Sequence, residues 1–182
     1  DPSPGAPGNG SGGKPNEETP DPPHCSETPS NIEGPFWIAD VPIRSDLNLY
    51  GENGQAITLT GQITDKTCNP IDNAIIEIWH ANPVGEYDNT SAEKRYRGQQ
   101  LTDASGNYTF HTLLPGRYLN GSAYRPMHIH VKVWLDGQQK LTTQIYFESD
   151  PYNEDDPWIE PALTVPIVET ATSRRAHFAI AV

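Results

Sequence analysis

Apolar and polar residues alternate in several short stretches of the chain, which is the pattern of half-buried β-strands. The stretches with this pattern are Ile57–Ile63, Ala74–His80, Asn107–His111, His128–Leu135, Leu141–Glu148 and Ala176–Val182. Turn-forming residues separate them, and Asp136-Gly137 between two of them predicts a tight hairpin. The pattern predicts an all-β protein, an antiparallel β-sandwich with long loops around its site and little helix.

The first residues of the chain differ in composition from the rest. Asp1 to about Pro23 contain no aromatic and no branched aliphatic residue, so they cannot bury enough apolar surface to offset the entropy lost on ordering. We expect residues 1–24 to be a flexible linker or tail and residues 25–182 to be the β-sandwich domain. A linker of this kind fits a secreted or cell-envelope protein whose signal peptide has been removed, with tethering to a membrane or wall. It equally fits a solvated tail without a role.

The net charge of the chain argues against one class of partner, the nucleic acids. A formal net charge of -12 repels phosphate backbones, so we expect no nucleic-acid partner. No apolar run approaches the roughly 20 residues needed to cross a bilayer, so we expect no transmembrane segment.

The two cysteines, Cys25 and Cys68, lie at neither the spacing of a CxxC pair nor that of a zinc finger. A disulfide between the start of the domain and an early turn is the expected arrangement, and it would need an oxidising compartment. Two free thiols are the alternative.

The local feature with the clearest chemistry is His128-Ile129-His130. In a strand both imidazoles point to the same side, where they can bind one metal ion. A pair of surface histidines without a ligand is the alternative. The neighbours favour a site, because Arg125 precedes the pair and two tyrosines, Tyr87 and Tyr118, follow turns earlier in the chain.

Several longer motifs occur in order: WHANPVGEY, RYRGQQLTDASGNYTF, LLPGRY, YRPMHIHVKVW and TTQIYFESDP. With them, the stretch from Cys25 to Val182 resembles the intradiol ring-cleavage dioxygenases, the family of catechol, hydroxyquinol and protocatechuate 3,4-dioxygenases. The opening at Cys25–Phe36 is similar to that of exported members.

The resemblance implies one non-haem iron(III) ion per chain and no organic cofactor. It assigns the metal ligands to Tyr87, Tyr118, His128 and His130. It also places Arg125 beside the substrate ring, Gln144 on the neighbouring strand, and Tyr118 as a base for the substrate. Phenolate oxygen suits a hard ferric ion, and the ion in turn lowers the tyrosine pKa from its usual value of about 10.

The implied reaction is cleavage of a small aromatic diol by O2 between its two hydroxylated carbons, giving a cis,cis-muconate-type diacid. The segment between Tyr118 and His128 looks shorter than in the protocatechuate enzymes. This segment helps to shape the mouth of the pocket, so the sequence does not identify which diol is the substrate. A helical dimerisation domain of the cytosolic type is not recognised, and we expect a monomer or weak oligomer. His80 is expected to be structural, or to support the metal ligands from behind.

Two rival interpretations come from other classes of protein. The segments GQITDKTCNPIDNAIIEIW and GNYTFHTLLPGRY also look like a transthyretin-like or carboxypeptidase-regulatory β-sandwich, a non-catalytic binding module. Such a module would need neither the Arg125-to-His130 motif nor Tyr87. The other rival is a copper or zinc protein that uses the histidines alone.

Overall fold

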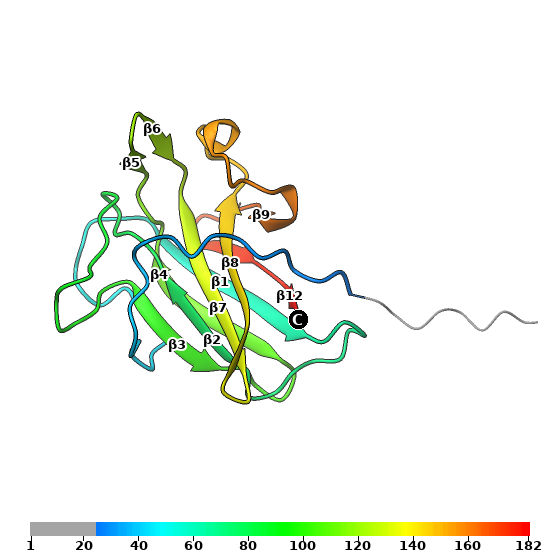
Figure 1. Cartoon of the computed structure of the whole chain (residues 1–182). Coiled ribbons are helices and arrows are strands. Elements are labelled where there is room, and N and C mark those ends of the chain that lie inside the picture. The colour runs from blue at the N-terminus through cyan, green and yellow to red at the C-terminus, as the bar shows by residue number, and fades with distance from the viewer. Residues whose placement is uncertain (1–24) are drawn as a thin grey trace, which may run out of the picture.

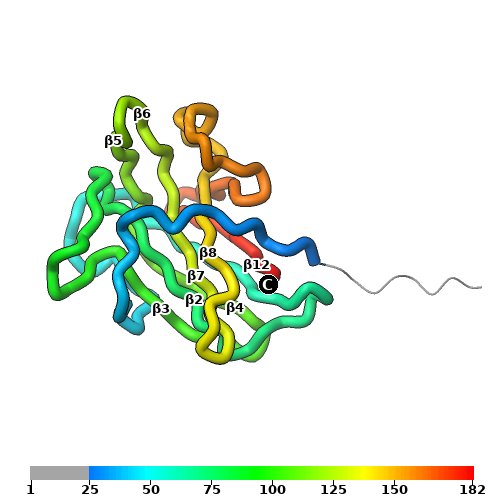
Figure 2. Tube along the Cα trace, in the orientation of Figure 1, coloured from blue at the N-terminus to red at the C-terminus, as the bar shows by residue number. Residues whose placement is uncertain are grey.

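Two five-stranded β-sheets form a sandwich, and a two-stranded hairpin projects from one end of it (Figures 1 and 2). The computed structural model describes residues 25–182; the predicted linker, residues 1–24, lies outside this range. In the first sheet the strand order is β3-β2-β7-β8-β9. These strands are, in that order, Arg97–Leu101, Ile75–Trp79, His128–Leu135, Gln138–Phe147 and Thr164–Val165.

The second sheet has the order β10-β11-β1-β12, and β4 also pairs with β1. Its strands are Val168–Glu169, Arg174–His177, Ala56–Thr64, Ile180–Ala181 and, for β4, Asn107–Leu113. The hairpin consists of β5 (Tyr118–Asn120) and β6 (Ala123–Arg125), and two 3-10 turns, η1 (Asn153–Asp155) and η2 (Pro161–Leu163), lie between β8 and β9. The predicted all-β sandwich is confirmed.

The alternation of side chains along β7 places its two histidines on the side of the sheet that faces away from the core. Its core-facing residues are Ile129, Val131 and Val133. The residues that alternate with them, His128, His130 and Lys132, face the opposite side and are also buried. A polar residue is buried on this side because another part of the chain covers the sheet there.

That cover is residues 25–37, which we call the strap. Figure 2 shows it in blue, crossing β8 and β7 on the outer face of the first sheet. It is held by a backbone bond from Asn31 N–H to Thr142 O (2.9 Å) and by a bond from Trp37 Nε1 to Glu77 Oε1 (2.6 Å). A disulfide joins its first residue, Cys25, to Cys68, with Cα atoms 5.2 Å apart.

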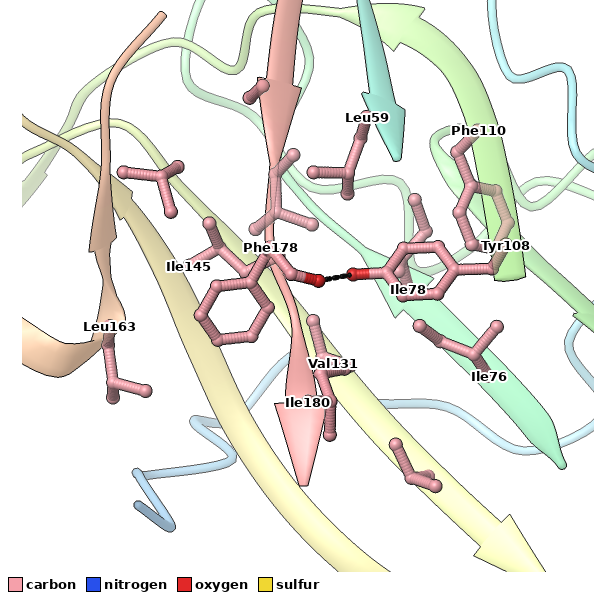
Figure 3. Packing of buried hydrophobic residues seen from close by; sticks show 14 of the residues in the cluster. Leu59, Ile76, Ile78, Tyr108, Phe110, Val131, Ile145, Leu163, Phe178 and Ile180 are labelled. Carbon is pink, nitrogen blue, oxygen red and sulfur yellow. Dashed lines mark hydrogen bonds between the residues drawn. The ribbon is translucent and has the colours of Figure 1, made fainter. Parts of the chain in front are cut away.

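A directed polar contact lies in the core between the sheets. The buried Tyr108 hydroxyl on β4 donates to the carbonyl of Phe178, 2.6 Å away (Figure 3). Gly61 on β1 lies against this contact; a Cβ there would be 2.0 Å from the Phe178 oxygen. Glycine is therefore required at this position by close approach.

The structure corrects the last predicted strand. Ala176–Val182 is not one strand, because the Phe178 carbonyl is taken by Tyr108 and the chain breaks into β11 and β12. Both pieces pair with β1 in parallel, and β9 pairs with β8 in parallel, so the sheets are mixed. By contrast, the predicted hairpin turn is confirmed: Asp136 and Gly137 have φ of 50° and 74° and join β7 to β8.

The structure also contains strands that the pattern did not predict: β3, β5, β6, β9 and β10. Among residues 25–182, no helix has the length and apolarity required to cross a membrane.

Candidate active site

Four aromatic side chains from three elements meet at one end of the first sheet. Tyr87 lies in the loop after β2, Tyr118 begins β5, and His128 and His130 lie on β7. The Tyr87 Oη atom is 3.2 Å from His128 Nε2 and 3.1 Å from His130 Nε2. The Tyr118 ring centre lies 5.7 Å from that of His128 and 5.7 Å from that of Tyr87. The structure thus brings together all four residues predicted from the sequence.

Two glycines allow the tyrosines to approach each other. The Tyr87 loop turns at Gly85, whose φ is 90°, and a Cβ there would meet the Arg117 carbonyl at 2.2 Å. Gly116 packs equally closely, since its Cβ would lie 2.3 Å from Gly85 N. The backbone on either side of this contact leads directly to Tyr87 and to Tyr118.

Burial keeps both site histidines in the neutral form that a metal ligand needs. Burial, reinforced by the cation of Arg125, lowers the pKa of His128 to about 3, and burial next to His128 holds the pKa of His130 well below 6.5. The His128 Nδ1–H donates to Pro126 O at 2.7 Å, which leaves the lone pair on Nε2. A neutral imidazole is the form that binds metals, through the ring nitrogen that carries the lone pair.

Burial also favours the neutral form of Tyr87. Burial raises its pKa well above 10, so without a cation the hydroxyl stays protonated. Its ring is stacked on Phe36 of the strap at 4.2 Å between centres, and the Trp79 ring is stacked on His130 at 4.7 Å. Both contacts fix rings whose polar atoms converge.

The donor set fits a hard, highly charged metal ion. In the described range, residues 25–182, no three His, Cys, Asp or Glu side chains converge to hold a metal. A metal here would therefore need tyrosine oxygen besides the two imidazoles. Phenolate oxygen with imidazole nitrogen suits ferric iron, which is the ion that the sequence resemblance implies.

The other two predicted site residues, Arg125 and Gln144, lie beside the histidines. Arg125 Nη2 donates to Gln144 Oε1 at 3.1 Å, and Arg125 Nη1 lies 3.4 Å from His128 Nε2. The Gln144 amide group donates to Asn31 Oδ1 at 2.9 Å and Ile32 O at 3.0 Å. The strap therefore holds Gln144, which in turn contacts Arg125.

Several neighbours of the site were missed by sequence reasoning: Phe36, Trp79, Tyr146, Asp156 and Trp158. Trp79 is fully buried, and its ring is stacked on His130. Tyr146 could have been found, since it lies two residues after Gln144 and so on the same face of β8. Asp156 had no such signal, because it lies in an irregular loop.

His80 behaves as expected of a structural histidine. It is buried, and its ring nitrogens are hydrogen-bonded to Ala81 O at 2.7 Å and Thr112 Oγ1 at 2.8 Å. Neither nitrogen faces the four converging rings.

The comparisons with known proteins agree with this geometry. The family model described as dioxygenase matches residues 32–180. Catechol 1,2-dioxygenase 2 of Acinetobacter lwoffii is 33% identical over 171 residues, covering 82% of this chain and 62% of that protein. Catechol 1,2-dioxygenase of Acinetobacter baylyi is 38% identical over 153 residues, covering 71% of this chain and 49% of that protein. The chain thus spans about half to two thirds of these relatives.

Solved structures agree as well. The dioxygenase domain of a dioxygenase carbohydrate-binding protein fusion from Streptomyces sp. SirexAA-E has a TM-score of 0.79 at 33% identity, covering 86% of this chain and 98% of that one. An intradiol ring-cleavage dioxygenase from Tetranychus urticae has a TM-score of 0.77 at 26% identity, covering 86% and 94%. Fold, site and sequence all give the same result: the chain belongs to the intradiol ring-cleavage dioxygenase family.

Proposed function

We propose that this protein is a non-haem iron(III) enzyme that opens catechol-type diols with O2 between the two hydroxylated carbons. The expected product is a cis,cis-muconate-type diacid. The observation that carries the proposal is the position of Tyr87 Oη, within 3.2 Å of His128 Nε2 and 3.1 Å of His130 Nε2. The names of the relatives, catechol and chlorocatechol 1,2-dioxygenases, support a small aromatic diol as substrate.

The proposed ligands of one iron ion are Tyr87, Tyr118, His128 and His130. When bound, iron(III) draws electron density from a chelated diol and makes a ring carbon reactive toward dioxygen. The protein supplies the rest of the chemistry. The stacked rings of Phe36 and Trp79 shield the inner side of the site from water, which strengthens its electrostatic interactions.

Tyr118 is the proposed base for the substrate. Its side chain is half-buried and lies against the rings of Tyr87 and His128. As a phenolate it can take a proton at Oη from one hydroxyl of an entering diol. Tyr118 lies at the base of the projecting hairpin, where it pairs with Arg125 in the strand register.

Arg125 is the proposed electrostatic partner of the ring. Its Nη1 atom lies 3.4 Å from His128 Nε2, at the inner wall of the site. Negative charge that develops on the ring during the reaction is stabilised by this guanidinium. Gln144 accepts a hydrogen bond from Arg125 Nη2, which keeps the guanidinium from turning away from the site.

The test is oxygen uptake by the iron-loaded protein with a panel of diols, with the product identified by mass. The loaded protein should be red-brown from tyrosinate-to-iron charge transfer. Tyr118→Phe or His130→Ala should abolish most of the turnover, whereas His177→Ala, on the exposed face of the other sheet, should not. A colourless protein, or near-normal turnover in either site variant, would argue for the binding-module or zinc alternatives.

We further propose that the protein works outside the cytoplasm as a monomer or weak oligomer. The Cys25–Cys68 disulfide supports an oxidising compartment. Thiol titration of the unfolded protein from its native host should find no free cysteine, and size-exclusion chromatography should give a mass near that of one chain. Two reactive thiols in that protein would contradict the location.

A further inference from the structure

Arg125 is a buried cation, and three of its five guanidinium N–H groups donate hydrogen bonds to other side chains. Only 4% of the residue is exposed. Its Nε–H donates to Asp156 Oδ2 at 2.8 Å, and Nη2 donates to Tyr146 Oη at 2.9 Å and to Gln144 Oε1 at 3.1 Å. A guanidinium has five N–H bonds, so these contacts use three and leave the two on Nη1.

The remaining nitrogen points into the site. The one contact of Nη1 within residues 25–182 is His128 Nε2, at 3.4 Å. That nitrogen has a single lone pair, which cannot accept from Arg125 while it binds a metal. With the metal in place, both N–H bonds of Nη1 are therefore available to a substrate.

Asp156 is itself held in place. Its carboxylate is fully buried, and the second oxygen, Oδ1, accepts from Trp158 N–H at 2.9 Å. The Trp158 ring covers the guanidinium, with the Arg125 carbon 4.6 Å from the ring centre. The carboxylate thus fixes one edge of Arg125 while the indole fixes one face.

Tyr146 holds the neighbouring nitrogen, Nη2. It is fully buried on β8, directly across from His128 in the strand register. Its hydroxyl receives Nη2–H and lies 3.3 Å from Gln144 Oε1, to which it donates. Asp156 and Tyr146 therefore hold two different nitrogens of the guanidinium, one from the loop after η1 and one from β8.

We propose that Asp156 and Tyr146 are positioning residues that hold Arg125 so that only Nη1 faces the substrate. This inference rests on the proposed function. A lone buried guanidinium could rotate and offer any of its edges, whereas the paired group presents one fixed donor pair. Orientation of this kind is effective because small displacements of a reacting group are costly to the rate.

The first test is Asp156→Asn. An amide has one oxygen, so Arg125 Nε–H or Trp158 N–H loses its acceptor and the guanidinium is free to turn. We expect kcat/KM for catechol to fall about 10- to 100-fold, mostly in kcat, because the lost contact strengthens as charge develops on the ring. Tyr146→Phe should show a smaller fall, and Asp156→Glu should recover part of the loss. Glu169→Gln, which breaks an exposed ion pair with Arg174, is the control for charge.

The decisive measurement is a double-mutant cycle with Arg125→Ala. If Asp156 acts through Arg125, adding Asp156→Asn to Arg125→Ala costs no further activity. The double variant should also melt higher than Arg125→Ala alone, because it removes a buried carboxylate left without its partner. The affinity for catechol can be measured without O2 from the colour change of the iron-loaded protein. In Asp156→Asn this affinity should change less than kcat does.

Each outcome separates the two proposals. Full additivity in the cycle, or Asp156→Asn and Tyr146→Phe both within twofold of wild type, would overturn the positioning role while the enzyme assignment stands. A wild-type protein that opens no diol would overturn the proposed function and this inference with it. Should Asp156→Asn fail to fold, the cycle between Tyr146→Phe and Arg125→Ala decides the question in the same way.

Discussion

At the scale of single residues, the site depends on hydrogen bonds that select one form of a side chain. The Pro126 carbonyl holds the proton of His128 on Nδ1, and burial keeps both site imidazoles neutral. The sequence predicted that His128 and His130 share one side of a strand. It did not predict the tautomer, because that depends on where a backbone carbonyl lies in three dimensions.

His80 gives the protein a pH dependence that is independent of the site. Burial lowers its pKa to about 4, against 6.5 for an unperturbed histidine. The unfolded chain therefore binds a proton that the folded protein excludes, and stability falls as the pH drops from 6.5 toward 4. At pH 5 this residue alone should cost about 2 kcal/mol of unfolding free energy.

The measurement is urea denaturation of wild type and His80→Gln at pH 7.5 and pH 5. The variant should lose less stability on acidification than wild type, whereas His177→Gln, at an exposed position, should match wild type. Equal losses in His80→Gln and wild type would show that His80 is not the titrating group.

Gly34 combines a backbone requirement with a contact to the site. Its φ is 70°, and a Cβ there would lie 3.4 Å from His130 Cε1, an ordinary contact. Gly34→Ala should therefore cost about 1–2 kcal/mol from backbone strain. Gly51→Ala is the matched control, because Gly51 has φ of 65° with no atom near its Cβ. Both variants should lose similar stability in urea; a loss only in Gly34→Ala would mean that crowding of His130 dominates.

At the scale of elements, local periodicity predicted strands well where one face is apolar. His128–Leu135 has the predicted bounds, because polar and apolar residues alternate from His128 to Val133. In contrast, β3 has the sequence Arg-Gly-Gln-Gln-Leu, which lacks such a pattern, and it is a strand because β2 pairs with it. The parallel direction of β11 and β12 also depends on partners far away in the chain.

The same limit applies to the site. Motifs in the sequence located Tyr87, Tyr118, His128 and His130, and the structure brings them together. Asp156 was not found, since it reaches Arg125 across 31 positions from a loop with no regular pattern. Residues that act through a long-range hydrogen bond leave no periodic signal.

Tyr108 links β4 to the break between β11 and β12. Its hydroxyl donates to Phe178 O within the core, so Tyr108→Phe leaves a buried carbonyl without this donor. The variant should lose about 1–3 kcal/mol of unfolding free energy. Urea denaturation checks this, with Tyr124→Phe on the exposed hairpin as control. Unchanged stability of Tyr108→Phe would mean that the carbonyl finds another donor.

At the scale of the whole molecule, the disulfide joins the strap to the turn between β1 and β2. Cys25 and Cys68 are 43 positions apart, and a loop of that length corresponds to about 4 kcal/mol in the chain-entropy model. Cys25→Ser should lower the melting temperature of the oxidised protein, and reduction of wild type should lower it similarly. A melting temperature that changes in neither experiment would contradict this contribution.

The distribution of site residues along the chain has a consequence for biosynthesis. The strap supplies Asn31 and Phe36, whereas Arg125 depends on Asp156, which lies close to the last strands. A growing polypeptide thus carries both imidazoles well before it contains everything that orients them. The hydrogen bonds that surround Arg125 can therefore form only after residue 156 has been synthesised, and proteolytic fragments that end before it lack them.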